Sequence, residues 1–363
     1  MGLLFRIKHS LLPLHQKSAR KLHELKYIFF ELTHKCNANC LHCGSDCIKD
    51  SETPDLRQDA ILKVLEEIKD HYDSHRITVV LSGGEPLCYP DVFKLGRRIT
   101  GLEYPWGMVT NGYAWTYQKI QEAKRAGLQT ITVSLDGLEE DHDWLRGHKN
   151  SFRRAVGTIE MLVKNRFWQA MDVVTCVNRR NIQKLDELYE FIKNLGVERW
   201  RLFTISPIGR AVCQPDLFLD QQEFVFLMDR IRELKKRKEI FLNYSESGYL
   251  GPKLELCVRD QQYFCRAGIN VAGIMVNGDI LACPNIDRRF KQGNIYRDSF
   301  VDVWESKYQI FRDRSWMRVA ECEKCSEWKF CQGNSFHLWD VDNNCTKLCY
   351  CKRYGLMDIP DFP

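Results

Sequence analysis

The chain has 363 residues, with 53 basic and 48 acidic side chains and a formal net charge of +5. This mild charge gives no indication of a nucleic-acid or membrane-surface partner, and no stretch approaches the ~20 apolar residues of a membrane span. The length allows a sizeable core and two domains, or one barrel with an appendage.

Sixteen cysteines are present, and most of them fall into two groups. A disulfide scaffold is typical of short secreted chains, whereas this chain is long and has no recognisable export signal, so we expect metal binding in the cytoplasm. Cys47, Cys88, Cys176 and Cys213 lie outside the two groups. The groups are Cys36, Cys40 and Cys43 towards one end of the chain, and Cys257, Cys265, Cys283, Cys322, Cys325, Cys331, Cys345, Cys349 and Cys351 towards the other.

The first 25 residues are rich in basic side chains, such as Lys17, Arg20 and Lys21, with a short apolar patch at Leu11 and Leu12. No small-residue cleavage site follows, as a secretory signal would require. We therefore expect a solvated, partly helical arm over residues 1–25. An arm that contacts a peptide is the less favoured alternative.

A cysteine loop follows the first strand pattern, which covers residues 27–32. Its three thiols, Cys36, Cys40 and Cys43, have C-x3-C-x2-C spacing. Three thiolates leave a tetrahedral metal or a cubane one ligand short, and soft sulfur ligands favour iron–sulfur clusters, zinc or Cu(I). A [4Fe–4S] cluster with one iron open to another ligand fits best, although Cys47 follows closely enough to compete as a fourth ligand.

The alternative for this loop is three buried structural cysteines on one face of a helix, because the spacing i, i+4, i+7 is also helical. Asn37, Asn39 and Gly44 argue against that alternative, because these residues favour turns over helix interiors.

Strand and helix patterns then alternate up to about residue 235. Six strand-then-helix units with buried strands predict a parallel sheet with right-handed crossovers, in which ligand-binding groups collect at the carboxyl ends of the strands. The strands are expected at residues 27–32, 77–81, 106–109, 130–135, 171–177 and 199–205, and the helices at residues 58–70, 92–99, 117–126, 152–165, 185–195 and 221–238.

Polar motifs stand where several of these strands end. Gly83 and Gly84 follow the second strand and allow the backbone to approach a ligand closely, although an ordinary Gly-Gly turn is the alternative. Glu85 can then present a carboxylate or a carbonyl to a cationic group. Ser134 and Asp136 end the fourth strand in the same way.

In this order, the cysteine loop, the Gly-Gly-Glu-Pro motif and the Ser-Leu-Asp-Gly motif resemble those of the radical S-adenosylmethionine (radical SAM) enzymes. The resemblance implies a partial six-unit TIM-like α/β barrel over residues 26–235, open on one side to admit a bulky substrate. It also implies a [4Fe–4S] cluster on Cys36, Cys40 and Cys43, whose fourth iron is chelated by SAM. The implied SAM-binding residues are Gly83, Gly84, Glu85 and Pro86 for the amino group, Ser134 and Asp136 for the ribose and nearby groups, and Arg146 for the carboxylate, with a surface arginine as its alternative.

Beyond the barrel we expect a bridge over residues 236–256, a cysteine-rich region over residues 257–355 and a tail over residues 356–363. Asn277-Gly278 is a strong hairpin signal within that region. The cysteine spacings C-x12-G-x4-C and C-x2-C-x5-C resemble the SPASM extension of radical SAM enzymes, which in full form holds two auxiliary [4Fe–4S] clusters. One or two structural zinc sites are the alternative, because C-x2-C is also a zinc spacing.

Ser335 stands where the SPASM pattern has a further cysteine. The resemblance therefore implies one cluster that lacks its usual fourth thiolate and is completed by a tail cysteine, by His337 or by substrate. The implied ligands are Cys257, Cys265 and Cys283 for this cluster, and Cys322, Cys325, Cys331 and one of Cys345, Cys349 or Cys351 for the other.

Together these features predict an enzyme that cleaves SAM reductively and uses the 5′-deoxyadenosyl radical to oxidise or cross-link a side chain of a ribosomal peptide or protein. A flavodoxin- or ferredoxin-type protein would donate the electron. Pro284 stands where sulfatase-maturing relatives have an aspartate, which disfavours that branch. The alternatives are an enzyme acting on a small molecule, such as an amino sugar or tetrapyrrole, and a non-catalytic iron–sulfur or zinc protein.

Overall fold

The computed structural model describes residues 3–245 and 248–357, so most of the expected tail lies outside the described residues. Its main sheet has ten strands. They are β1 (Tyr27–Glu31), β2 (Thr78–Ser82), β3 (Trp106–Thr110), β4 (Thr130–Ser134), β5 (Ala170–Val177), β6 (Arg199–Thr204), β7 (Phe241–Tyr244), β8 (Val271–Ile274), β9 (Asp279–Leu281) and β10 (Gly293–Asn294).

The strand order is β10-β9-β8-β1-β2-β3-β4-β5-β6-β7. All pairs from β8 through β1 to β7 are parallel, whereas β9 pairs antiparallel with both β8 and β10. The six strands expected from the sequence are all present, and the predicted α/β fold is confirmed.

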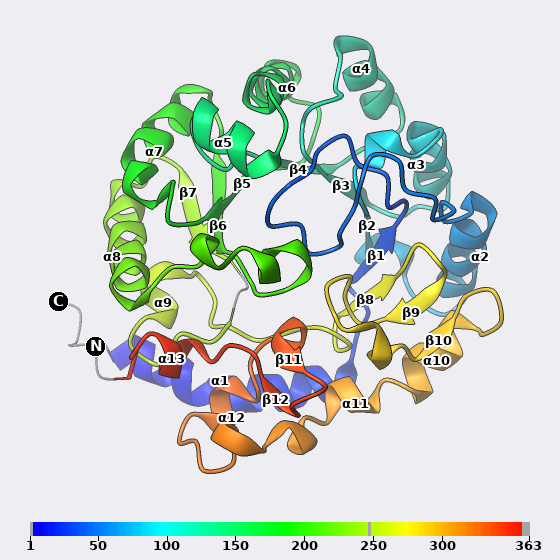
Figure 1. The fold of residues 1–363 in the computed structure, drawn as a ribbon. Coiled ribbons are helices and arrows are strands. Elements are labelled where there is room, and N and C mark those ends of the chain that lie inside the picture. The colour runs from blue at the N-terminus through cyan, green and yellow to red at the C-terminus, as the bar shows by residue number, and fades with distance from the viewer. Residues whose placement is uncertain (1–2, 246–247, 358–363) are drawn as a thin grey trace.

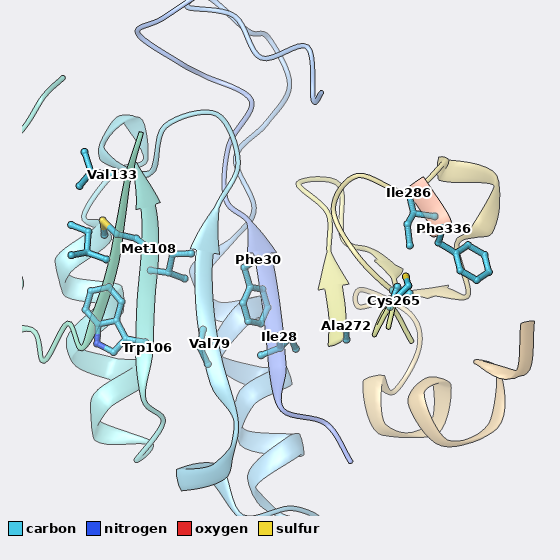
Figure 2. Close-up of a cluster of buried hydrophobic side chains, with 14 of the residues drawn as sticks. Ile28, Phe30, Val79, Trp106, Met108, Val133, Cys265, Ala272, Ile286 and Phe336 are labelled. Atoms are coloured by element: carbon cyan, nitrogen blue, oxygen red, sulfur yellow. The ribbon is translucent and has the colours of Figure 1, made fainter. Parts of the chain in front are cut away.

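Helices form a ring outside the curved sheet (Figure 1). Along β5, half-buried and buried side chains alternate, because successive side chains of a strand point to opposite faces. The buried face joins the core with the helices, as Phe30, Val79 and Trp106 illustrate (Figure 2). The other face lines the inside of the curve. The helices are α2 (Gln58–Lys69), α3 (Val92–Gly101), α4 (Tyr117–Arg125), α5 (Glu139–Arg146), α6 (Ser151–Asn165), α7 (Leu185–Asn194) and α8 (Gln221–Arg237).

The parallel sheet extends beyond the six expected units at both edges. At one edge β7, which lies within the expected bridge, pairs with β6 and buries Leu242 and Tyr244. At the other edge β8, from the cysteine-rich region, pairs with β1. The predicted hairpin is present: Gly278 (φ +83°) forms the turn between β8 and β9, with its N–H bonded to the Met275 carbonyl at 2.8 Å. The cysteine-rich region is therefore built onto the barrel sheet.

The N-terminal segment differs from the solvated arm that its charge suggested. It forms α1 (Leu3–Leu22), and one face of this helix is buried against the C-terminal region (Figure 1). Leu12 is buried, and Gln16 donates a hydrogen bond to the Phe330 carbonyl at 2.8 Å. The basic residues mark the exposed side of an amphipathic helix, whose apolar side packs on the protein.

The C-terminal region consists of short elements joined by turns. They are α9 (Glu255–Val258), α10 (Phe300–Ser306), α11 (Gln309–Arg312), α12 (Trp328–Cys331), α13 (Tyr350–Arg353) and the two-stranded β11 (Trp339–Asp340) and β12 (Cys345–Thr346). None of the described helices has both the length and the apolar composition that a bilayer span requires.

Candidate functional site

The cysteine loop leaves the carboxyl end of β1 and is fixed by backbone hydrogen bonds from several directions. Asn39 N–H is bonded to the Arg146 carbonyl at 3.0 Å, and Leu41 N–H to the Leu145 carbonyl at 2.9 Å. Arg210 N–H is bonded to the Cys43 carbonyl at 3.0 Å. The loop is thus a rigid irregular segment and not a helix, as its turn-forming residues predicted.

The three predicted cluster cysteines line one cavity of about 220 Å³, where the loop meets the carboxyl ends of β2, β3 and β4. The predicted SAM-binding residues divide into two sets with respect to this cavity. Gly83, Gly84, Ser134 and Arg146 line it, whereas Glu85, Pro86 and Asp136 are not among its lining residues.

The two glycines of the β2 turn are required by close packing against the cysteine loop. An ideal Cβ on Gly83 (φ +126°) would lie 2.5 Å from the Thr33 carbonyl oxygen, and one on Gly84 would lie 2.2 Å from the Lys35 carbonyl oxygen. The N–H of Gly84 is bonded to the Thr33 carbonyl at 2.7 Å. Any side chain here would displace the loop that carries the cysteines.

Glu85 turns its carboxylate away from the cavity and into the protein. The carboxylate accepts hydrogen bonds from Thr110 Oγ1 at 2.8 Å, Asn111 N at 2.8 Å and Leu87 N at 3.2 Å. Burial raises the pKa of Glu85, and these hydrogen bonds oppose the effect. The side chain therefore fixes the end of β3, a positioning role that differs from direct contact with a ligand.

Asp136 and Arg146 form a buried ion pair beside the loop. Arg146 Nε donates to Asp136 Oδ2 at 2.6 Å, and Arg146 Nη1 donates to the sulfur of Cys40 at 3.6 Å. Burial by itself would raise the pKa of Asp136, but Arg146, the two histidines His42 and His142 and the Cys176 N–H together outweigh it, and the pKa is lowered. Asp136 therefore stays ionised and orients a cation towards the cavity.

Two residues that the sequence predictions did not assign to the site also contact the loop. Asn111 donates from Nδ2 to Asn37 Oδ1 at 2.7 Å and to the sulfur of Cys36 at 3.7 Å. Arg210 donates from Nε to the Cys40 carbonyl at 2.9 Å. Both residues line the cavity and stand just beyond the carboxyl ends of β3 and β6, which is the signal that could have identified them.

His42, Asp136 and Cys176 also lie together, with one potential ligand atom of each within 4.8 Å of the others. A second metal ion at this position would be repelled by Arg146, which is already bonded to the Asp136 carboxylate. Burial lowers the pKa of His42 to about 4, so the ring is neutral where it lines the cavity. We therefore assign no metal to this group, of which His42 lines the cluster cavity while Asp136 and Cys176 do not.

A second pocket, of about 540 Å³, is lined by five cysteines of the C-terminal region. They are Cys322, Cys325, Cys331, Cys349 and Cys351. Burial, and then Cys349 and other neighbours, raise the pKa of Cys322 to about 12. Burial, and then Cys351, Cys349 and Cys322, raise the pKa of Cys331 well above its usual value. Such a group of mutually close thiols fits an iron–sulfur cluster, which is held by four thiolates.

Within this group, Cys351 donates from Sγ to the Tyr249 carbonyl at 3.6 Å. Cys345, which the sequence also offered as a fourth ligand, is not among the lining residues, although it contributes to the raised pKa of Cys322. Cys349 and Cys351 therefore both lie where a fourth ligand is needed, and we take Cys349, the thiol with the largest effect on the pKa of Cys322.

The other three predicted ligands are in different surroundings. Cys257 donates from Sγ to the Lys253 carbonyl at 3.2 Å. Cys265 is buried in the apolar core with Ile286 and Phe336 (Figure 2), and Cys283 packs against the same core. None of the three lines the five-cysteine pocket.

Ser335 stands at the position where the SPASM pattern has a cysteine, and its side chain is bonded within the protein. Ser335 is buried, and its hydroxyl is hydrogen-bonded to that of Tyr263. His337, the other residue considered as a ligand, has Nε2 3.3 Å from Ser206 Oγ, and burial lowers its pKa to about 4. Neither Ser335 nor His337 offers a thiolate, so neither can complete a cluster held by four thiolates.

Comparison with known families gives two matches. The radical SAM superfamily model matches residues 30–192, and the SPASM iron–sulfur cluster-binding domain model matches residues 265–326. The first match contains the cysteine loop and all the lining residues named above except Arg210. The second contains Cys265, Cys283, Cys322 and Cys325.

Two relatives align with most of the chain. The AdoMet-dependent heme synthase of Methanosarcina barkeri is 26% identical over 325 residues, which cover 85% of this chain and 90% of that protein. Mycofactocin maturase MftC of Mycobacterium tuberculosis is 29% identical over 311 residues, which cover 84% of this chain and 76% of that protein.

The fold is also similar to that of Streptococcus suis SuiB bound to its precursor peptide SuiA. The TM-score is 0.71 at 18% sequence identity, over 93% of this chain and 79% of that chain. At this identity the likeness concerns the fold alone, and it agrees with the parallel α/β sheet described above.

Proposed function

The chain is a radical SAM enzyme with a SPASM domain, and from this premise we propose that it oxidises or cross-links a side chain of a ribosomally made peptide. Enzymes of this kind bind iron–sulfur clusters and SAM. The observation that carries the proposal is that the three loop cysteines, the Gly-Gly turn, Ser134 and Arg146 share one cavity at the carboxyl ends of the strands.

In this proposal Cys36, Cys40 and Cys43 hold the cluster that supplies the electron for cleavage of the SAM sulfonium bond. Arg146 offers a fixed cation to the SAM carboxylate, as charge-assisted hydrogen bonding favours. Gly83 and Gly84 line the cavity and would present backbone groups to the amino group.

Other residues of the chain tune and shield this site. Asn111 and Arg146 donate hydrogen bonds to the sulfurs of Cys36 and Cys40, and such bonds raise the reduction potential of an iron–sulfur cluster. The buried positions of Cys36 and Cys40 keep water from these two sulfurs. A flavodoxin- or ferredoxin-type protein would supply the electron.

The SPASM region would hold one auxiliary cluster on Cys322, Cys325, Cys331 and Cys349. Its role would be to accept the electron that remains on an oxidised substrate radical. A four-thiolate cluster suits electron transfer, because it leaves no iron open to bind substrate.

A peptide substrate is supported by the similarity to a maturase, MftC, over 84% of the chain. The likeness to SuiB, whose structure contains a precursor peptide, agrees with this assignment at the level of the fold.

A small tetrapyrrole is the second candidate substrate, because the heme synthase of Methanosarcina barkeri is also similar over 85% of the chain. A pocket of about 350 Å³ in the region of β6 and β7 is lined by Arg201, Arg259 and Arg266 and by the aromatic rings of Phe203 and Phe264. Arg201 and Arg259 are paired with Asp172 and Glu255, so the Arg266 guanidinium and the aromatic faces are what would suit a flat molecule that carries a carboxylate.

The test has two stages. The reconstituted enzyme, reduced with dithionite, should release 5′-deoxyadenosine from SAM, and the Cys36→Ala/Cys40→Ala/Cys43→Ala variant should release none. Cys213→Ala, which changes an exposed cysteine, should behave as wild type. Release by the triple variant would disprove the loop assignment.

Mass spectrometry would then identify the substrate class. A small peptide encoded beside this gene should lose hydrogen, usually two atoms per link, when it is co-expressed with the active enzyme. A carboxylate-bearing tetrapyrrole modified in place of the peptide would favour the second candidate.

A further inference from the structure

Cys47 is a fourth thiol in the wall of the cluster cavity. It follows Cys43 after three residues, is 2% exposed, and lines the cavity together with the three cluster cysteines. Its Sγ donates a hydrogen bond to the Ser45 carbonyl at 3.7 Å, and its thiol packs with that of Cys43. Cys88, by contrast, is half-buried and is not among the lining residues.

The backbone holds Cys47 at this position from two sides. The next residue, Ile48, forms a bridge to the start of the loop, with its N–H bonded to the His34 carbonyl at 3.1 Å and its carbonyl accepting from Cys36 N–H at 3.0 Å. Arg210 Nη1 donates to the Cys47 carbonyl at 3.0 Å. The backbone of Cys47 is therefore fixed at the wall of the cavity that the three cluster cysteines also line.

Packing does not account for a cysteine at this position. Cys47 belongs to a small buried cluster that is separate from the main core and consists of Cys36, Ala38, Cys40 and Cys47, with Cys43 packed against it. The apolar neighbours of the Cys47 thiol are thus chiefly the thiols that are proposed to bind iron. A cysteine that served only to fill space would instead contact the aliphatic and aromatic core.

We propose that Cys47 binds the fourth iron of the loop cluster until SAM displaces it; this inference rests on the proposed function of the loop. Four thiolates give a closed cluster that retains its iron, whereas three leave one iron exposed to loss. When SAM binds, the Cys47 thiolate leaves the iron and takes up the proton that the SAM ammonium group loses as its nitrogen binds. The exchange consumes no electron and no net proton. Cys47 would thereby protect the cluster before the substrate complex forms.

The test compares wild type with Cys47→Ala and Cys47→Ser in the iron-loaded full chain. Without SAM, ferricyanide oxidation should produce a several-fold larger [3Fe–4S] EPR signal in both variants, because their fourth iron has no protein ligand. Added SAM should suppress this signal. Both variants should also bind SAM about tenfold more tightly than wild type, as expected when a competing state that occupies about nine-tenths of the molecules is removed.

Controls separate this proposal from the function on which it rests. The triple loop variant reports the [3Fe–4S] signal of any auxiliary cluster, which is subtracted, and Cys88→Ala should match wild type. Equal signals and equal SAM affinities in wild type and Cys47→Ala would disprove the proposal. The proposal would also be disproved if Cys47→Ser, but not Cys47→Ala, behaved as wild type. Serine preserves the shape of the cysteine side chain but provides a harder ligand, which iron–sulfur clusters disfavour. If wild type and the triple loop variant contain the same amount of iron, the proposed function itself is wrong.

Discussion

Arg146 donates a hydrogen bond to the sulfur of Cys40, with Nη1 and Sγ 3.6 Å apart. Burial by itself would lower the pKa of Arg146, but the charges of Asp136 and Cys40 raise it above its usual value. The cation is therefore permanent, and it lies beside a predicted cluster ligand. A fixed positive charge at this position favours the reduced, more negative state of a cluster.

We expect Arg146→Gln to lower the reduction potential of the loop cluster and to weaken SAM binding by about 10- to 100-fold, because hydrogen bonds to charged groups contribute about 1.5–3 kcal/mol. An EPR-monitored redox titration measures the potential, and calorimetry measures the affinity. Arg146→Lys keeps the charge without the planar fork, so it should restore part of the potential and little of the affinity. An unchanged potential in Arg146→Gln would mean that this residue only neutralises Asp136.

Gly84→Ala should reduce the iron content of the loop, because the new Cβ would lie 2.2 Å from the Lys35 carbonyl oxygen and would displace the loop. Gly157→Ala is the matched control, since a Cβ there has no atom within 4 Å and lies in the interior of α6. This control should gain about 0.5–1 kcal/mol of stability. Iron analysis and thermal unfolding measure both effects, and a fully loaded Gly84→Ala chain would contradict the packing argument.

The pH dependence of stability should report on His142, which is buried. Its Nδ1 accepts a hydrogen bond from Asp136 N–H at 2.9 Å, and Nε2 lies 3.2 Å from Ser151 Oγ. Burial lowers the pKa of His142 from 6.5 to about 4. The ring is therefore neutral in the folded chain, and its contribution to stability is full above about pH 6.5 and is lost as the pH falls towards 4.

Across this range the free energy of unfolding should fall by about 1.4 kcal/mol per pH unit on account of this one group. His142→Asn keeps an acceptor near the Nδ1 position and removes the titration, so its stability should depend less steeply on pH. Denaturant unfolding between about pH 7 and pH 5 measures the two slopes. Identical slopes in wild type and His142→Asn would contradict this assignment.

The sequence predicted the barrel because its first six strands are apolar, β-branched runs that alternate with amphipathic helices. It predicted the hairpin turn after β8, but it did not predict β7 or the pairing of β8 with β1. Both strands are only four residues long and are recognisable chiefly by their pairing. Short strands carry little periodicity, and their pairing depends on segments that are distant in the chain.

The same limit applies to the site. The cysteine loop and the Gly-Gly turn are local motifs, so their residue types indicated the chemistry directly. Arg210 contacts the Cys40 carbonyl across 170 residues of sequence, and Asn111 reaches the Cys36 sulfur across 75. The inward direction of the Glu85 carboxylate depends on Thr110, which belongs to another strand. Such contacts follow from the fold and not from spacing.

The number of clusters can be tested by counting the iron and sulfide ions in the loaded chain. With one cluster in the loop and one in the five-cysteine pocket, the loaded chain should contain about eight iron and eight sulfide ions. A third cluster would raise each number to about twelve. We expect the lower value, because the Ser335 hydroxyl is hydrogen-bonded to Tyr263 and Cys265 is buried in the apolar core.

Cys349→Ala should then lose about four iron ions while SAM cleavage in the loop persists, because the two clusters have separate ligands. Cys345→Ala should retain them, since Cys345 does not line the pocket. Ser335→Ala should retain all the iron, because its hydroxyl binds only a tyrosine among its described partners. Iron loss in Cys345→Ala but not in Cys349→Ala would show that Cys345, and not Cys349, is the fourth ligand. About twelve iron ions in wild type would show that a second auxiliary cluster is present.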